Sequence, residues 1–142
     1  AEGVRDGRVW VLPGGPACPG YARSVLRDAL AELGVDRARC SDAQLMVSEL
    51  ATNAFQHAGD HGPHELWLYT AGGPPGAGAE IRCAIFDRLP CDLPGYSWTS
   101  GDCGRGLAIV RELSEGRWGM VRTTARLGAP VPGKAVWFAL PH

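Results

Sequence analysis

Apolar residues recur with the period of an α-helix in the first half of the chain. Between residues 17 and 33 they stand at Val25, Leu26, Ala29, Leu30 and Leu33. This spacing predicts a helix over 17–33 that ends at Gly34, because glycine readily adopts the backbone conformation that closes a helix. Ser41 and Asp42 are suited to cap a second helix, which runs to about Ala58.

Strands are predicted where apolar and polar residues alternate or where apolar runs are short. Residues 65–70 place Leu66 and Leu68 on one face and Trp67 and Tyr69 on the other. The other predicted elements are strands over 8–12, 79–87, 118–123 and 134–140 and a short helix over 107–113. Their order predicts an α+β two-layer sandwich, in which helices cover one face of a mixed, mostly antiparallel sheet.

The composition favours one folded domain without a strong net charge. The 142 residues are 45% hydrophobic and 20% charged, which suits a single domain over 1–142. A formal charge of -1 provides no long-range attraction to the nucleic-acid backbone. No apolar run approaches the roughly 20 residues that cross a bilayer. We therefore expect no direct nucleic-acid partner, no membrane span and no leader segment.

The cysteines are scattered and include no Cys-x-x-Cys pair. They stand at Cys18, Cys40, Cys83, Cys91 and Cys103. An odd number without paired spacing suits a reducing, cytoplasmic setting better than a disulfide framework.

The predicted second helix carries the residues with the most informative chemistry. Glu49 and Asn53 are four residues apart, so they share one helix face, and Gln56 and His57 fall on nearly the same stripe. A carboxylate can accept a proton from an attacking hydroxyl or water, and a carboxamide oxygen can ligate Mg²⁺. A solvated polar face has the same spacing, so the pattern alone leaves both interpretations open.

Two later segments offer chemistry for binding a ligand. Asp87 ends an apolar strand, where its carboxylate could accept a hydrogen bond from an exocyclic amine or could simply form a turn. Gly104 and Gly106 precede the predicted third helix, so backbone N–H groups there could approach a phosphate, with Arg105 beside them. A flexible hinge would contain the same glycines. Residues 88–103 lack periodicity and are interpreted as a long functional loop.

Taken in this order, the segments resemble the GHKL ATPase superfamily, which includes gyrases and histidine kinases. Residues 49–58 are similar to its N-box, Asp87 stands where the aspartate of its first glycine box belongs, and residues 104–110 resemble its second glycine box. Residues 133–140 and the pair Ala22-Arg23 are similar to one branch of the superfamily, the anti-sigma-factor serine/threonine kinases. The resemblance covers nearly the whole chain, and the N-box is its most specific part.

The resemblance implies the Bergerat fold and a site for ATP and Mg²⁺. By position in the motifs, Glu49 would be the general base, Asn53 would hold Mg²⁺ against the ATP phosphates, and Asp87 would bind the adenine amine. His57 would line the phosphate end of the site or would be a structural histidine. Residues 88–103 would form the lid over ATP. The residues implied to lie against the phosphates are Gly104, Arg105, Gly106 and Leu107.

The resemblance also implies an activity and partners. Members of this branch transfer the γ-phosphoryl group of ATP to a serine of a STAS-domain antagonist protein, sequester a sigma factor and often form homodimers. Arg23 would belong to the partner-binding surface.

Two departures from the motifs support an alternative function. Arg88, Leu89 and Pro90 follow Asp87 where relatives place glycines, and Ala135 stands where relatives often carry a threonine near adenine. The alternative is a non-catalytic interaction module that keeps the fold but has lost productive ATP binding.

A metal site is a third interpretation of the sequence. His57, His61 and His64 are close in the chain and flank a glycine-rich break, so they could converge on a metal with a cysteine. The lack of paired cysteine spacing weighs against this interpretation.

Overall fold

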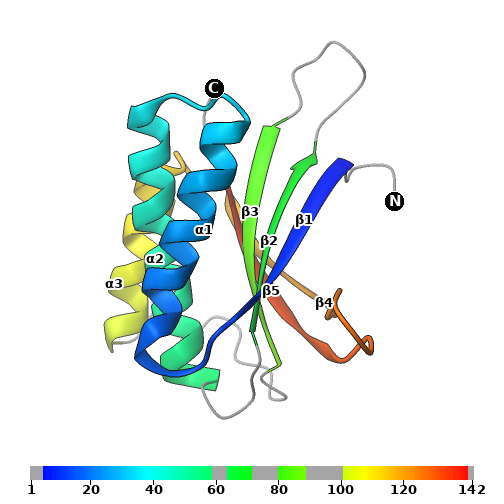
Figure 1. Cartoon of the computed structure of the whole chain (residues 1–142). Helices are drawn as coiled ribbons and strands as arrows, with labels where there is room; N and C mark the ends of the chain where they lie inside the picture. Colours follow the sequence, from blue (N-terminus) through cyan, green and yellow to red (C-terminus); the bar gives the residue numbers. More distant parts are fainter. Residues whose placement is uncertain (1–4, 59–63, 72–79, 89–100, 141–142) are drawn as a thin grey trace.

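The computed structural model describes residues 5–58, 64–71, 80–88 and 101–140 (Figure 1). In chain order the elements are β1 (Arg5–Leu12), a 3-10 turn η1 (Gly15–Ala17), α1 (Cys18–Glu32), α2 (Arg37–Ala58), β2 (His64–Ala71), β3 (Glu80–Asp87), α3 (Gly101–Leu113), β4 (Trp118–Thr124) and β5 (Pro132–Ala139). Every helix and strand predicted from the sequence is present. The differences lie at the ends of elements.

The five strands form one sheet in the order β1-β2-β3-β5-β4. All of the described strand pairings are antiparallel, so the mixed component predicted from the sequence is not found among the described residues. Helices α1, α2 and α3 lie together on one face of the sheet (Figure 1). The predicted α+β two-layer sandwich with helices on one face is confirmed.

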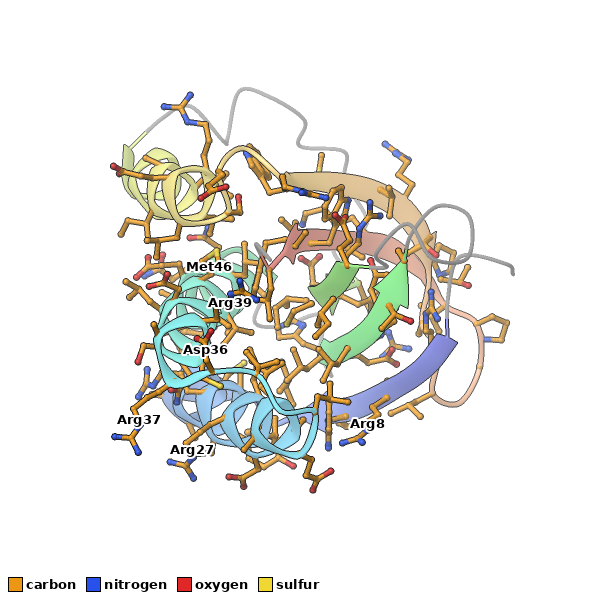
Figure 2. All side chains as sticks on the ribbon, turned by 90° about the horizontal axis from the view of Figure 1, so that it is seen from above. Arg8, Arg27, Asp36, Arg37, Arg39 and Met46 are labelled. Atoms are coloured by element: carbon orange, nitrogen blue, oxygen red, sulfur yellow. The ribbon has the colours of Figure 1, made fainter. Side chains whose placement is uncertain are left out.

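The main core lies between the helices and the sheet. Leu66 and Leu68 face this core, whereas Trp67 packs on the opposite face of the sheet, as the alternation in β2 predicts. From α2, Met46 is fully buried in the same core. Seen from above, the two layers lie side by side, and Arg27 and Arg37 point away from the sheet (Figure 2). Removing apolar surface from water between the layers is therefore the main stabilising contribution to this architecture.

Helix α1 ends where the sequence predicts. Gly34 has a positive φ of 80°, which glycine adopts without steric cost. The N–H of Val35 donates to the carbonyl oxygen of Leu30 at 3.0 Å, so the chain beyond the helix pairs with a carbonyl group of the last helical turn.

Helix α2 begins earlier than predicted, at Arg37 rather than at Ser41. Asp36 provides the cap, because its Oδ1 accepts a hydrogen bond from the backbone N–H of Arg39 at 2.8 Å. The prediction from Ser41 and Asp42 was wrong because both residue types cap helices, and the sequence alone does not say which candidate is used.

Helix α3 also begins earlier than predicted, at Gly101 rather than at residue 107. Leu107 and Val110 are buried in the main core and anchor the helix. Once such a turn is formed, each further residue adds a hydrogen bond at low cost, and no proline interrupts residues 101–106. The last three residues of the predicted lid are therefore helical, whereas residues 89–100 lie outside the described residues.

Candidate functional site

Three segments with predicted site residues lie at the same end of the molecule. The C-terminal end of α2, the end of β3 and the start of α3 are all found at the lower end in Figure 1. Helix α2 packs against both α3 and β3. The fold therefore brings the C-terminal half of α2, which carries Glu49 and Asn53, toward the same end as the end of β3 and the start of α3, although Glu49 and Gly106 are 57 residues apart in the chain.

Glu49 and Asn53 lie at the edge of the buried face of α2. Both residues are half-buried, beside Met46 and Leu50 of the main core. Glu49 makes no hydrogen bond or ion pair with any other residue that the structure describes. The carboxylate is thus held on a rigid helix and is not engaged by the described part of the protein.

The amide of Asn53 has an unusual environment. Its Nδ2 atom is buried, yet it has no hydrogen-bond partner among the described residues. Leaving a buried polar group unpaired costs about 1–3 kcal/mol, so such a group calls for an explanation. The Nδ2 group is a hydrogen-bond donor that the described residues leave unused, whereas the Oδ1 atom of the same amide is of the type suited to Mg²⁺. Asn53 therefore fits a role in holding Mg²⁺ with a nucleotide.

Asp87 is the most buried acid at this end of the molecule among the residues described there. Its exposed fraction is 3%, and it lies in phase with Cys83 and Ile85, which face the helices. Lys134 stands opposite Asp87 on β5 and donates hydrogen bonds to both carboxylate oxygens, at 3.0 and 2.8 Å. The carboxylate predicted to bind an adenine amine is therefore paired with an ammonium group.

The strands approach closely beside this pair at Gly133. A Cβ atom there would come within 2.1 Å of the backbone oxygen of Asp87 and 2.6 Å of the Phe86 ring. A backbone atom cannot move aside as a flexible side chain can, so only glycine fits at this position without a shift of the strands.

Ala135 does not face this site. It packs with Trp67, Ala84 and Phe86 on the opposite face of the sheet. Side chains alternate along β5, so Lys134 occupies the helix-facing position that the sequence analysis sought at Ala135. The lack of a hydroxyl at Ala135 therefore does not affect the helix-facing side of the sheet, where Asp87 and Lys134 lie. Sequence analysis missed Lys134, although it is the only lysine in the chain.

The remaining predicted site residues divide into three groups. Leu107 is buried in the main core, so its side chain is part of the packing. The backbone of residues 104–106 is helical, whereas their side chains and that of His57 lie outside the described residues. Arg23 is exposed on α1 and donates to Ser48 Oγ of α2 at 3.0 Å, which leaves its predicted partner role untested.

The structure gives no support to the metal interpretation. Among the residues it describes, no group of three or more His, Cys, Asp or Glu side chains could hold a metal ion. His61 and the side chain of His57 lie outside that part of the chain. Burial raises the pKa of the thiols of Cys18 and Cys83, so both remain protonated at neutral pH.

A second buried carboxylate, Glu65, lies on the opposite face of the sheet. It accepts hydrogen bonds from Trp67 Nε1 at 2.8 Å and from the backbone N–H groups of Arg126 and Leu127 at 3.0 and 3.2 Å. The Arg126 guanidinium in turn lies 4.2 Å above the Trp67 ring. These contacts hold the β4–β5 connection against the sheet, which is a structural role.

Comparison with protein families places this chain in a known one. Residues 16–117, more than two thirds of the chain, match the family described as the histidine kinase-like ATPase domain. The matched region contains Glu49, Asn53, Asp87 and the glycine segment, but not Lys134. A comparison with curated proteins found no match. Within the described residues, none of the helices is both long enough and apolar enough to span a membrane.

Proposed function

The chain belongs to the family of histidine kinase-like ATPase domains, and from this premise we propose that it binds Mg-ATP and transfers the γ-phosphoryl group to a serine of a partner protein. The observation that carries the proposal is the buried Nδ2 atom of Asn53, which has no hydrogen-bond partner among the described residues and belongs to the C-terminal half of α2, the helix whose end lies at the same end of the molecule as the end of β3 (Figure 1). The family match supports nucleotide binding as the shared property of such domains.

The proposed roles follow the chemistry of the side chains. Asn53 would hold Mg²⁺, which neutralises charge on the phosphates when it is bound. Glu49 would accept the proton of the serine hydroxyl, whose oxygen forms the new bond to the γ-phosphorus as the bond to ADP breaks. Asp87 would accept a hydrogen bond from the adenine amine.

The partners are proposed from the resemblance to the anti-sigma kinase branch. The acceptor would be a STAS-domain antagonist protein, the sequestered protein would be a sigma factor, and the chain would act in the cytoplasm, where homodimers are expected. The free thiols of Cys18, Cys40 and Cys83 support a reducing compartment. Arg23, exposed on α1, is the residue proposed to contact a partner.

Calorimetric titration with Mg-ATP tests nucleotide binding. We expect the wild type to bind and Asn53→Ala to lose at least tenfold in affinity, because the amide is the proposed metal ligand. Gln56→Ala is the matched control, since this amide is exposed one turn further along the same helix. Absence of binding to the wild type, or equal loss in both variants, would contradict the proposal.

Phosphoryl transfer tests the role of Glu49. We expect Glu49→Ala to bind Mg-ATP with little change but to lose about 10²–10⁴-fold in transfer rate, the usual contribution of a general base. Glu112→Ala, which removes an exposed acid from α3, is the control. Transfer by Glu49→Ala at the wild-type rate would remove the assigned role.

One observation favours the alternative of a non-catalytic interaction module. Lys134 engages both oxygens of Asp87, the carboxylate that would otherwise bind adenine. This alternative predicts that a partner is captured equally well with and without nucleotide, whereas strict dependence of capture on ATP would contradict it.

A further inference from the structure

The Asp87–Lys134 pair has features that a purely structural ion pair does not require. Its side chains are 5% and 15% exposed, and it lies on the helix-facing side of the sheet, at the end of the molecule where α2 also ends. Burying two charges costs free energy that their attraction often does no more than offset, so a well-packed apolar pair would serve the fold equally well. The pair therefore calls for a use beyond stability.

The choice of lysine is also informative. The chain contains thirteen arginines and a single lysine, and that lysine is Lys134. An arginine fork matches a carboxylate with two parallel hydrogen bonds, whereas a lysine ammonium is a compact charge with three donors that rotate together. Two of the three donors are directed to Asp87, at 3.0 and 2.8 Å, which leaves a third for another acceptor.

The carboxylate offers acceptor positions as well. A carboxylate has about four lone-pair positions, and the two hydrogen bonds from Lys134 occupy two of them. The pair thus presents an acceptor beside a donor. An adenine ring presents the complement, an exocyclic amine that donates beside a ring nitrogen that accepts.

We infer that Lys134 is a base-recognition residue, which donates a hydrogen bond to a ring nitrogen of adenine while Asp87 accepts one from the neighbouring amine. This inference rests on the proposed function, since it assumes that the site takes a nucleotide. It assigns the role to a residue outside the region that matches the family, and it explains why the carboxylate is paired rather than free.

The test uses ATP analogues that each lack one ring nitrogen. The wild type is titrated by calorimetry with the Mg complexes of ATP, 1-deaza-ATP, 7-deaza-ATP and GTP. We expect one of the two deaza analogues to bind about tenfold to hundredfold more weakly than ATP, because a hydrogen bond from a charged donor is lost. This arm needs no variant, so it does not depend on how a substitution affects folding.

Titration of Lys134→Met with the same ligands completes a cycle, in which removal of the lysine side chain is combined with removal of each ring nitrogen. We expect it to bind ATP more weakly by a similar factor and to lose the discrimination between ATP and the sensitive analogue. Arg122→Met is the matched control, because Arg122 is an exposed cation directly opposite Lys134 on β4, and it should keep that discrimination. Thermal unfolding of both variants shows whether the fold is retained.

The single lysine provides a direct readout besides affinity. Labelling with ¹⁵N-lysine gives one side-chain ammonium signal, that of Lys134. We expect ATP to shift this signal strongly and the sensitive deaza analogue to shift it much less.

Three results would overturn the inference, and they are distinguishable from failure of the proposed function. Equal binding of both deaza analogues and ATP by the wild type would show that no ring nitrogen is recognised. Tighter ATP binding by Lys134→Met would show that the lysine competes with adenine, and tighter binding of GTP than ATP would show that another base is preferred. In these cases nucleotide binding stands, whereas a wild type that binds none of the four ligands would overturn both proposals.

Discussion

Glu65 and Asp87 are buried carboxylates on opposite faces of the sheet, and they are held in different ways. Glu65, on the face away from the helices, is held by the Trp67 indole and by two backbone N–H groups. Asp87, on the helix-facing side, is held by the side chain of Lys134. Backbone donors are fixed by the fold, whereas an ammonium group at the end of a four-carbon chain can turn toward another acceptor. The first arrangement suits stability, and the second suits recognition.

The largest effect is expected at Glu65. Glu65→Gln replaces an oxygen by an NH₂ group, so at least one N–H of the β4–β5 connection faces a donor instead of an acceptor. We expect a loss of about 3 kcal/mol in the free energy of unfolding, since hydrogen bonds to charged groups are the strong ones. Urea unfolding measures it, with Glu112→Gln on the exposed face of α3 as the control. If Glu65→Gln lost less free energy of unfolding than Asp87→Asn, the proposed difference between the two carboxylates would be contradicted.

Gly133→Ala moves the strand beside Asp87 without altering any charge. The added Cβ would lie 2.1 Å from the backbone oxygen of Asp87, so β3 and β5 must separate locally. We expect a loss of about 2 kcal/mol, the usual range for an overpacked site. Gly14→Ala is the control, because a Cβ there meets no atom within 4 Å and its φ of -77° is ordinary. Unchanged thermal stability would show that the strands adjust freely.

Asp87→Asn is expected to cost less stability than Glu65→Gln but to lower nucleotide affinity. Lys134 keeps the amide oxygen as an acceptor and is 15% exposed, so we expect a loss of about 1.5 kcal/mol, below that for a fully buried pair. Urea unfolding and Mg-ATP calorimetry on the same samples separate the two effects. Glu65→Gln is the counterpart, because we expect it to lose stability but to bind Mg-ATP with unchanged affinity when it is folded.

The smallest effect is expected at Asp36. Because this carboxylate accepts a backbone N–H without being buried, it shows the effect of a backbone donor apart from the effect of burial. This carboxylate is exposed but accepts the N–H of Arg39 at 2.8 Å. Asp36→Ala should cost about 1 kcal/mol, as expected for loss of a helix cap. Asp28→Ala, which removes an exposed acid from α1 paired only along the surface with Arg27, should change little. A loss at Asp36 as large as that at Glu65 would show that burial adds nothing to a backbone-held carboxylate.

Local patterns predicted most of the elements but not their ends. Apolar spacing located each helix and strand, and the alternation in β2 correctly separated Leu66 and Leu68 from Trp67. The start of α2 was wrong because Asp36 and Ser41 are both good caps. The start of α3 was wrong because the glycines of residues 101–106 weaken a helix without ending it. End positions depend on small free-energy differences, which neighbouring elements decide.

By itself, the amino-acid sequence determined the two-layer α+β architecture and the helix spacing that places Glu49 and Asn53 on one face, because both follow from local periodicity. It also contained the region, residues 16–117, that matches the family of histidine kinase-like ATPase domains. Only the tertiary structure decided that Lys134, 47 residues along the chain, pairs with Asp87, and that Ala135 faces the other side of the sheet. Strand register sets these two outcomes, and register depends on packing across the whole sheet, since a shift by one residue would exchange the faces of Lys134 and Ala135.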